Sequence, residues 1–298
     1  VYRGDKKLFM VKKIKYICQA VIIYFFIFII KLIGLNLSRK FFSSLFIKIG
    51  PYIKSKNVIY SNLNKFMGTY NEEKKREIIN CMWSNYGSTF VEYLHLKKFR
   101  NSEEHIKIKG ENILERILSE DKPVIFISGH FANFELMSME ITKRNIKLAT
   151  IYRPLNNFLV NPIMEYCRRT YVCKNQIKKG ISGVKESIDY IKKNHSIALM
   201  IDQRVSEGKR LPFFEHMALT TTLPAQLALK YNLDIVPIYI CRKENNTFEM
   251  EVYEPIKIFN NQETETKKLG VSLQLNKILE QMISKDPGQW IWTHNRWK

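Results

Sequence analysis

The chain has 298 residues, 45% of them hydrophobic, so it is long enough to bury one large α/β core. Lysine and arginine (48) outnumber aspartate and glutamate (28), and the net charge of +20 favours an anionic partner such as nucleic acid, an anionic lipid surface or an acidic protein. The five cysteines include no C-x-x-C pair, which argues against a disulfide framework and favours a reducing compartment. The six histidines are dispersed and none stands at ligand spacing from a cysteine, so we expect no zinc site.

The first predicted element is apolar and long. Residues 16–37 are interrupted chiefly by Gln19 and Lys31, and as a helix they would span about 33 Å, enough to cross the hydrocarbon core of a membrane. Basic residues stand on both sides, so charge asymmetry predicts no orientation. A cleaved signal peptide and a buried or surface-lying helix are the alternatives, but no small-residue cleavage site follows. We expect residues 1–40 to be a membrane anchor, followed by a domain over residues 41–298.

Residues 41–105 are expected to form a helical entry segment to this domain. An amphipathic pattern over 41–53 ends at a Gly-Pro pair, which is typical of a helix stop. Residues 57–100 read as two helices, because apolar residues at 78, 79, 82, 83 and 86 are spaced for one buried face.

From residue 106 onward, strand and helix patterns alternate. We expect strands at 123–127, 147–152, 196–201, 235–240 and 248–253, and helices at 132–143, 160–170, 183–193, 222–231 and 268–284. Strands that alternate with helices predict an α/β fold with a mostly parallel central sheet flanked by helices.

The segment 123–135 is the most informative motif. An apolar strand leads through Ser128 and Gly129 into His130, and Glu135 follows five residues later, at a predicted strand-to-helix junction. If Nδ1 of His130 donates to Glu135, the other ring nitrogen is left as a base for a hydroxyl group. A structural histidine with satisfied hydrogen bonds is the alternative.

Polar side chains follow two further predicted strands. Arg153 comes after one, and Asp202 with Arg204 comes after another, so these side chains are expected at one edge of the sheet. A fixed guanidinium at Arg153 suits either phosphate binding or stabilisation of an oxyanion. Residues 220–222 supply a helix N-cap, where exposed N–H groups can also hold an anion.

Several motifs in this order resemble a known family, the lauroyl/myristoyl acyltransferases of lipid A biosynthesis within the wider lysophospholipid acyltransferase group. The resemblance covers most of the chain, including the N-terminal anchor. The segments that carry it are 82–83 through Glu92-Tyr-Leu-His95, Ser128-Gly-His-Phe-Ala-Asn-Phe-Glu135, Tyr152-Arg-Pro-Leu-Asn-Asn157, Asp202-Gln203, Pro212-Phe-Phe214, Thr220-Thr-Thr-Leu-Pro-Ala-Gln-Leu-Ala228 and the C-terminal Gln289-Trp-Ile-Trp-Thr-His-Asn-Arg-Trp-Lys298.

The resemblance implies an O-acyltransferase that moves a fatty acyl chain from an acyl carrier protein thioester to a hydroxyl of a lipid A precursor, a phosphorylated glycolipid. It implies a location at the inner membrane with the catalytic domain on the cytoplasmic face, and it implies neither a cofactor nor a metal. His130 would be the general base and Glu135 its orienter. Substrate binding is assigned to Asn133, Arg153, Arg169, Asp202 and Gln203.

The chain departs from the family pattern at four positions, and the same motifs could also serve other acceptors. Ala132 and Phe134 stand where the family commonly has glycine and tryptophan, Glu215 stands where glycine is usual, and Asn295 replaces a common basic residue. A glycerolipid or a glycosylated phosphoinositide could replace the lipid A precursor as acceptor. A more distant alternative is a non-catalytic, membrane-tethered module that binds anions, but the basic residues are dispersed and no nucleic-acid-binding motif is apparent.

Overall fold

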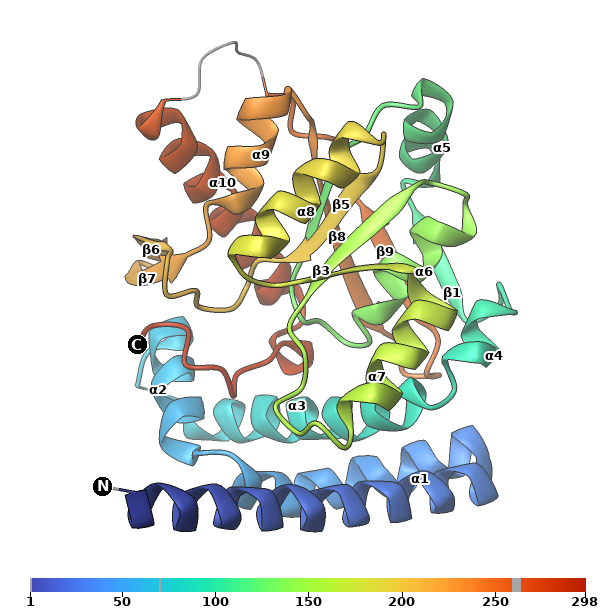
Figure 1. Ribbon diagram of the computed structural model, residues 1–298, viewed down its shortest axis with the longest axis vertical. Coiled ribbons are helices and arrows are strands. Elements are labelled where there is room, and N and C mark those ends of the chain that lie inside the picture. The colour runs from blue at the N-terminus through green and yellow to red at the C-terminus, as the bar shows by residue number, and fades with distance from the viewer. Residues whose placement is uncertain (1, 70, 259–263) are drawn as a thin grey trace.

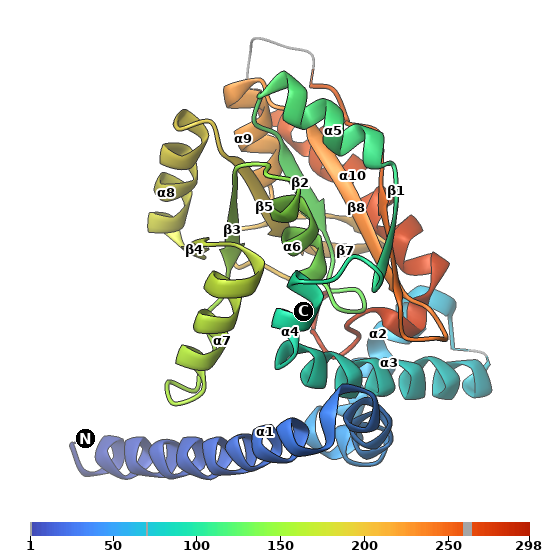
Figure 2. The same cartoon turned by 90° about the vertical axis from the view of Figure 1, so that its right-hand side faces the viewer.

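A seven-stranded sheet forms the centre of the molecule (Figures 1 and 2). The computed structural model describes residues 2–69, 71–258 and 264–298. The strand order is β1-β9-β8-β2-β5-β3-β4, and neighbours are parallel except β8 and β9. The strands are β1 (Ile106–Lys109), β2 (Ile125–Ser128), β3 (Leu148–Tyr152), β4 (Asn175–Lys178), β5 (Ser196–Met200), β8 (Ile235–Arg242) and β9 (Phe248–Val252). The prediction of an α/β fold with a mostly parallel sheet is confirmed.

Alternate residues of the central strands pack against helices on opposite faces. On β2, Ile125 and Ile127 join a core with residues of α9 and α10, whereas Phe126 joins a second core with residues of α5 and α6. Both faces are therefore buried, which explains why the central strands are continuous apolar runs. The helices are α5 (Glu111–Glu120), α6 (Glu135–Lys143), α7 (Asn161–Cys167), α8 (Ile181–Lys192), α9 (Leu223–Tyr231) and α10 (Glu265–Lys285).

The structure also contains strands that the sequence patterns did not predict. β1 and β4 are the two edges of the sheet and have four residues each. β6 (Lys209–Phe213) and β7 (His216–Thr220) form a separate antiparallel hairpin. Its two-residue turn, Phe214 and Glu215, has positive φ at both positions (48° and 61°), the conformation that makes glycine common in such turns. The Glu215 side chain is exposed there.

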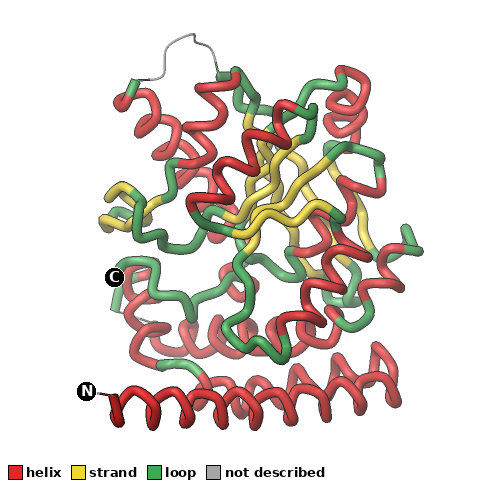
Figure 3. The backbone as a smooth tube through the Cα atoms, viewed as in Figure 1, coloured by secondary structure: helices red, strands yellow, loops and turns green. Residues whose placement is uncertain are grey.

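The N-terminal part of the chain is helical and lies along one end of the domain (Figures 1 and 3). Helix α1 (Tyr2–Ile53) reverses direction at Gly34, whose φ of 75° and ψ of 177° break the helical geometry. Helices α2 (Lys56–Met67), α3 (Glu72–Tyr93) and α4 (Leu96–Arg100) follow. The second arm of α1 packs closely on α3. Gly87 of α3 lies against the backbone of Phe42 of α1, and any side chain at position 87 would collide with it. The predicted boundary at residue 40 falls inside this arm.

One side of the first arm of α1 is exposed and apolar. Large exposed residues recur there at intervals of three and four: Met10, Ile14, Ile17, Val21, Phe25, Phe28 and Leu32. This spacing places them on one side of a helix. By length and composition, the segment Met10–Ile53 contains a stretch apolar enough to cross a membrane. An anchoring role fits such a helix.

Candidate active site

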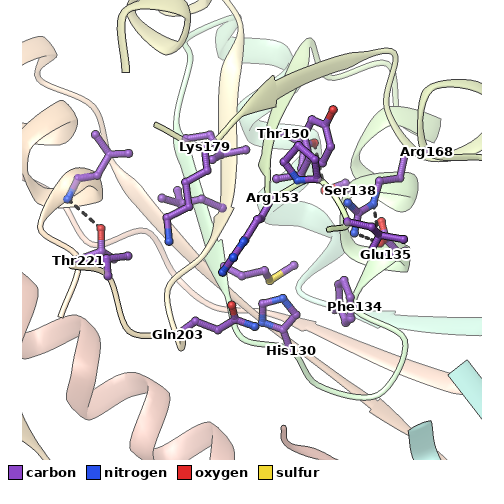
Figure 4. Close-up of a pocket in the computed structure, with 18 of the residues that line it drawn as sticks. His130, Phe134, Glu135, Ser138, Thr150, Arg153, Arg168, Lys179, Gln203 and Thr221 are labelled. Carbon is purple, nitrogen blue, oxygen red and sulfur yellow. Dashed lines mark hydrogen bonds and ion pairs between the residues drawn. The ribbon is translucent and has the colours of Figure 1, made fainter. Parts of the chain in front are cut away.

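Polar side chains from four strand ends meet at a single cavity. His130 follows β2, Arg153 follows β3, Lys179 follows β4 and Gln203 follows β5. All four line a cavity of about 450 Å³ at the carboxyl edge of the sheet (Figure 4). Ligand sites of open α/β sheets lie at this edge, because the loops that follow parallel strands converge there.

His130 is held by a buried carboxylate that comes from the neighbouring strand. Its Nδ1 lies 2.8 Å from Oδ1 of Asp202, and its backbone N–H donates to Oδ2 of the same carboxylate at 2.8 Å. Trp290 Nε1 also donates to Oδ2, at 2.9 Å. Asp202 is 0% exposed, whereas the His130 side chain is 21% exposed. The carboxylate thus fixes one ring nitrogen and leaves the other free for chemistry.

Asp202 is ionised at neutral pH in spite of its burial. Burial by itself raises the pKa of Asp202, but the positive charge that His130 can carry and the donors from His130 and Trp290 outweigh burial, so this pKa lies below its usual value. The ionised Oδ1 of Asp202 is a hydrogen-bond acceptor, so Nδ1–H of His130 is the donor in this pair. Nε2 is then the basic nitrogen of a neutral imidazole.

The prediction that His130 donates a hydrogen bond to Glu135 is wrong. Glu135 is the first residue of α6, and its Oε1 accepts from Nε and an Nη of Arg168 at 2.8 and 2.6 Å. Phe134 lies against the His130 ring instead, with centroids 4.6 Å apart. Figure 4 shows the Glu135 and Arg168 side chains paired, away from His130. The sequence motif correctly predicts a carboxylate partner for His130, but that partner is Asp202 and not Glu135.

Arg168 is a residue of the cavity that the sequence patterns did not single out. It opens a short π-helical turn (Arg168–Val172) after α7, and its guanidinium lies over the Tyr152 ring at 5.5 Å. Burial lowers its pKa, but the nearby Glu135 carboxylate outweighs burial and raises the pKa above its usual value. Arg168 is therefore a permanent cation bound to Glu135. In the sequence, only the adjacent pair Arg168-Arg169 indicates a cation here. In the structure, Arg168 lines the cavity and Arg169 does not.

The other predicted substrate-binding residues divide into two groups. Arg153 and Gln203 line the cavity as expected. Arg169 is exposed and donates to the Lys174 carbonyl, outside the lining. Asn133 is 0% exposed and donates to Glu92, and Asp202 is 0% exposed and bound to His130, so neither lines the cavity. These contacts do not support direct substrate binding by either residue; Asp202 instead orients His130, and Asn133 holds the turn that follows it.

A second cavity of about 710 Å³ shares Arg153 and Lys179 with the first. Arg204 also lines it, as do Gly180 and Thr222, which precede α8 and α9, and Glu207. Burial and the charge of Arg153 lower the pKa of Lys179, although Glu207 opposes this. Basic groups beside two helix N-termini can hold an anionic group. Within residues 2–69, 71–258 and 264–298, no three His, Cys, Asp or Glu side chains are grouped to hold a metal ion.

Ala132 in the turn after His130 has a left-handed backbone, with φ of 42°. This conformation costs an L-residue about 1–2 kcal/mol, and glycine avoids that cost while losing about 0.5–1 kcal/mol through its greater freedom when unfolded. We expect Ala132→Gly to raise the free energy of unfolding by about 0.5–1 kcal/mol, measured by chemical denaturation. Ala228→Gly inside α9 is the control and should lower it. A destabilised Ala132→Gly variant would contradict the prediction.

Comparison with known proteins adds the evolutionary context. A family model described as bacterial lipid A biosynthesis acyltransferase matches residues 6–298. Two curated relatives are each 23% identical over 258 residues, covering 83% of this chain and 80% of the relative: the lipid A biosynthesis palmitoleoyltransferase of Escherichia coli (strain K12) and the lipid A biosynthesis acyltransferase of Shigella flexneri. Among solved structures, the 1-acyl-sn-glycerophosphate (LPA) acyltransferase PlsC from Thermotoga maritima has a TM-score of 0.37 at 15% identity, covering 83% of this chain and 98% of that chain.

Proposed function

We propose, because this chain belongs to the family of bacterial lipid A biosynthesis acyltransferases, that it transfers a fatty acyl chain from an acyl carrier protein thioester to a hydroxyl of a lipid A precursor. The observation that carries the mechanism is the pairing of His130, which lines the cavity, with the buried carboxylate of Asp202. A histidine held in this way has one basic nitrogen directed away from its carboxylate. That arrangement suits proton abstraction from an acceptor hydroxyl.

The chemical step follows from this base. Nε2 of His130 takes the hydroxyl proton as the acceptor oxygen attacks the thioester carbonyl carbon, and a tetrahedral oxyanion forms. The intermediate collapses with cleavage of the carbon–sulfur bond, and the departing thiolate takes the proton back from the imidazolium. The products are an ester and a free thiol. Asp202 stabilises the imidazolium during the cycle, and Arg153, which Figure 4 shows extending toward His130 and Gln203, is our candidate for the oxyanion partner.

The charges around the cavity support an anionic glycolipid as acceptor. Arg153, Lys179 and Arg204 come from three different loops; the first two line both cavities and Arg204 lines the second. Phosphate groups bind to such cations through charge-assisted hydrogen bonds. The excess of positive charge on the chain also favours association with an acidic carrier protein.

We propose that the first arm of α1, before Gly34, holds the rest of the chain at the inner membrane. The exposed apolar side of that arm supports contact with lipid, and the exposed Lys12, Lys13 and Lys15 lie in its N-terminal half, where they can pair with headgroup phosphates. A cytoplasmic catalytic domain follows from the proposed donor, because acyl carrier protein is cytoplasmic. The hydrophobic acceptor would then reach the cavity from the membrane.

Mass spectrometry of the lipid product tests the proposal. Detergent-solubilised protein is incubated with acyl carrier protein thioesters and a tetra-acylated lipid A precursor. Wild type is expected to add one acyl chain, and His130→Ala is expected to add none. His216→Ala is the matched control, because His216 is exposed on the β6–β7 hairpin and this variant should match wild type.

Each other result has a distinct meaning. A fully active His130→Ala variant would refute the mechanism. If wild type leaves the lipid A precursor unchanged but acylates a glycerolipid or a glycosylated phosphoinositide, the chemistry stands and the acceptor is wrong. If free acyl thioesters of small thiols serve as well as the carrier protein, the proposed donor is wrong.

A further inference from the structure

The C-terminal segment of the chain passes directly beside His130 and Asp202. In Figure 1 this segment, drawn in red, runs between α3 and the loops at the end of the sheet. Three of its residues make hydrogen bonds to those loops. The Gln289 carbonyl accepts from the backbone N–H of Ala132 at 3.1 Å, Trp290 Nε1 donates to Asp202 at 2.9 Å, and His294 Nε2 accepts from the backbone N–H of Arg204 at 2.9 Å.

These contacts restrain both sides of the histidine–aspartate pair. Ala132 lies two residues after His130, and Arg204 lies two residues after Asp202. The C-terminal segment therefore binds both the loop that carries His130 and the loop that carries Asp202. The Asp202 carboxylate has its Oδ1 directed at the imidazole and its Oδ2 held by two donors. Trp290 is the one side chain among these donors. Without it, Oδ2 would be held by the main-chain N–H of His130 alone, and both remaining contacts of the carboxylate would come from His130 itself.

Trp290 is itself fixed by its surroundings. It is 1% exposed and packs edge-on against Trp292, with centroids 4.6 Å apart, and against Phe213 at 6.1 Å. A rigid indole with one N–H group delivers its hydrogen bond in one direction. Burial lowers the pKa of His294 to about 4, so this histidine is neutral near pH 7 and its Nε2 remains an acceptor.

We infer that Trp290 is a positioning residue for catalysis, which aligns the Asp202 carboxylate with His130, and that His294 supports it by holding the loop after Asp202. This inference rests on the proposed role of His130 as the base. It assigns the C-terminal segment a function in the reaction rather than in folding alone. When a general base is misaligned by a fraction of an ångström, the rate of the chemical step falls, whereas the affinity for substrate changes less.

A double-mutant cycle separates this role from packing. Trp290→Phe removes the indole donor to Asp202, and Trp292→Phe is the matched control, because Trp292 is equally buried in the same cluster but donates to the Pro287 carbonyl. Each change is made in the wild-type chain and in Asp202→Asn. We expect Trp290→Phe to lower kcat about ten-fold or more with KM nearly unchanged, and to have little further effect in Asp202→Asn. Trp292→Phe should leave kcat within a few-fold of wild type.

The outcomes distinguish this inference from the proposed function. Equal kcat losses in Trp290→Phe and Trp292→Phe, or the same loss from Trp290→Phe in both backgrounds, would overturn it while wild type and His130→Ala still establish the base. Should Trp290→Phe fail to fold, His294 supplies a second test. His294→Leu should lower kcat, and His294→Gln, which retains an acceptor at the same distance along the side chain, should recover most of the loss. Failure of that recovery would also overturn the inference.

Discussion

Replacing Asp202 with asparagine is expected to lower kcat for acyl transfer by about 10³–10⁴-fold in a protein that remains folded. The asparagine amide can donate to Nδ1 of His130 where the carboxylate accepted from it. The imidazole proton then moves to Nε2, and the ring loses the lone pair that the mechanism needs. The rate is measured by mass spectrometry of the acylated product over long incubations.

Histidine tautomers provide a second readout of the same change. In protein labelled with ¹⁵N-histidine, the His130 resonances are identified by their loss in His130→Ala. Asp202→Asn is expected to shift the proton from Nδ1 to Nε2, whereas Glu135→Gln should leave the tautomer as it is, because Glu135 is bound to Arg168. If Glu135→Gln shifted the tautomer and Asp202→Asn did not, Glu135 would be the partner of His130 after all.

Much of the fold could be predicted because its central elements are long and strongly patterned. The predicted strands at 123–127 and 196–201 correspond to β2 and β5, and the predicted helix at 268–284 corresponds to α10. β1 and β4 were missed for a physical reason: edge strands of four residues are covered on fewer sides and need no continuous apolar run. Asn175-Gln-Ile-Lys178 contains a single aliphatic residue.

The identity of the carboxylate that binds His130 could not be predicted from local sequence patterns, for a different reason. His130 and Asp202 each stand two residues after paired positions on adjacent strands, since Ser128 of β2 is in register with Met200 of β5. The sequence places both residues at strand ends, but the order of strands in a sheet cannot be read from spacing along the chain. Glu135 was close in sequence, whereas Asp202 became close only through β2–β5 pairing.

Glu92 joins the anchor helix to the loop that carries His130, and we expect its removal to have the largest effect on stability. Its carboxylate is fully buried and accepts from Arg39 Nε of α1 at 2.7 Å, from both terminal nitrogens of Arg242 on β8, and from Asn133 Nδ2 at 3.1 Å. Glu92→Ala would leave two largely buried guanidinium groups without a counter-charge. A loss of this kind costs about 3–5 kcal/mol in the free energy of unfolding.

For a chain of this length, that cost corresponds to a decrease in Tm of roughly 5–8 °C, measured by thermal unfolding in detergent. Glu92→Gln should lose less, because an amide keeps the shape and part of the hydrogen bonding. Glu254→Ala is the control: Glu254 pairs with Arg116 on the exposed surface, and Tm should hardly change. Equal Tm values for Glu92→Ala and Glu254→Ala would show that the buried carboxylate does not stabilise the junction.

Because Asn133 donates to this carboxylate, Glu92→Ala should also lower acyl transfer at temperatures where the variant is still folded. The expected cause is disorder of the turn between β2 and α6.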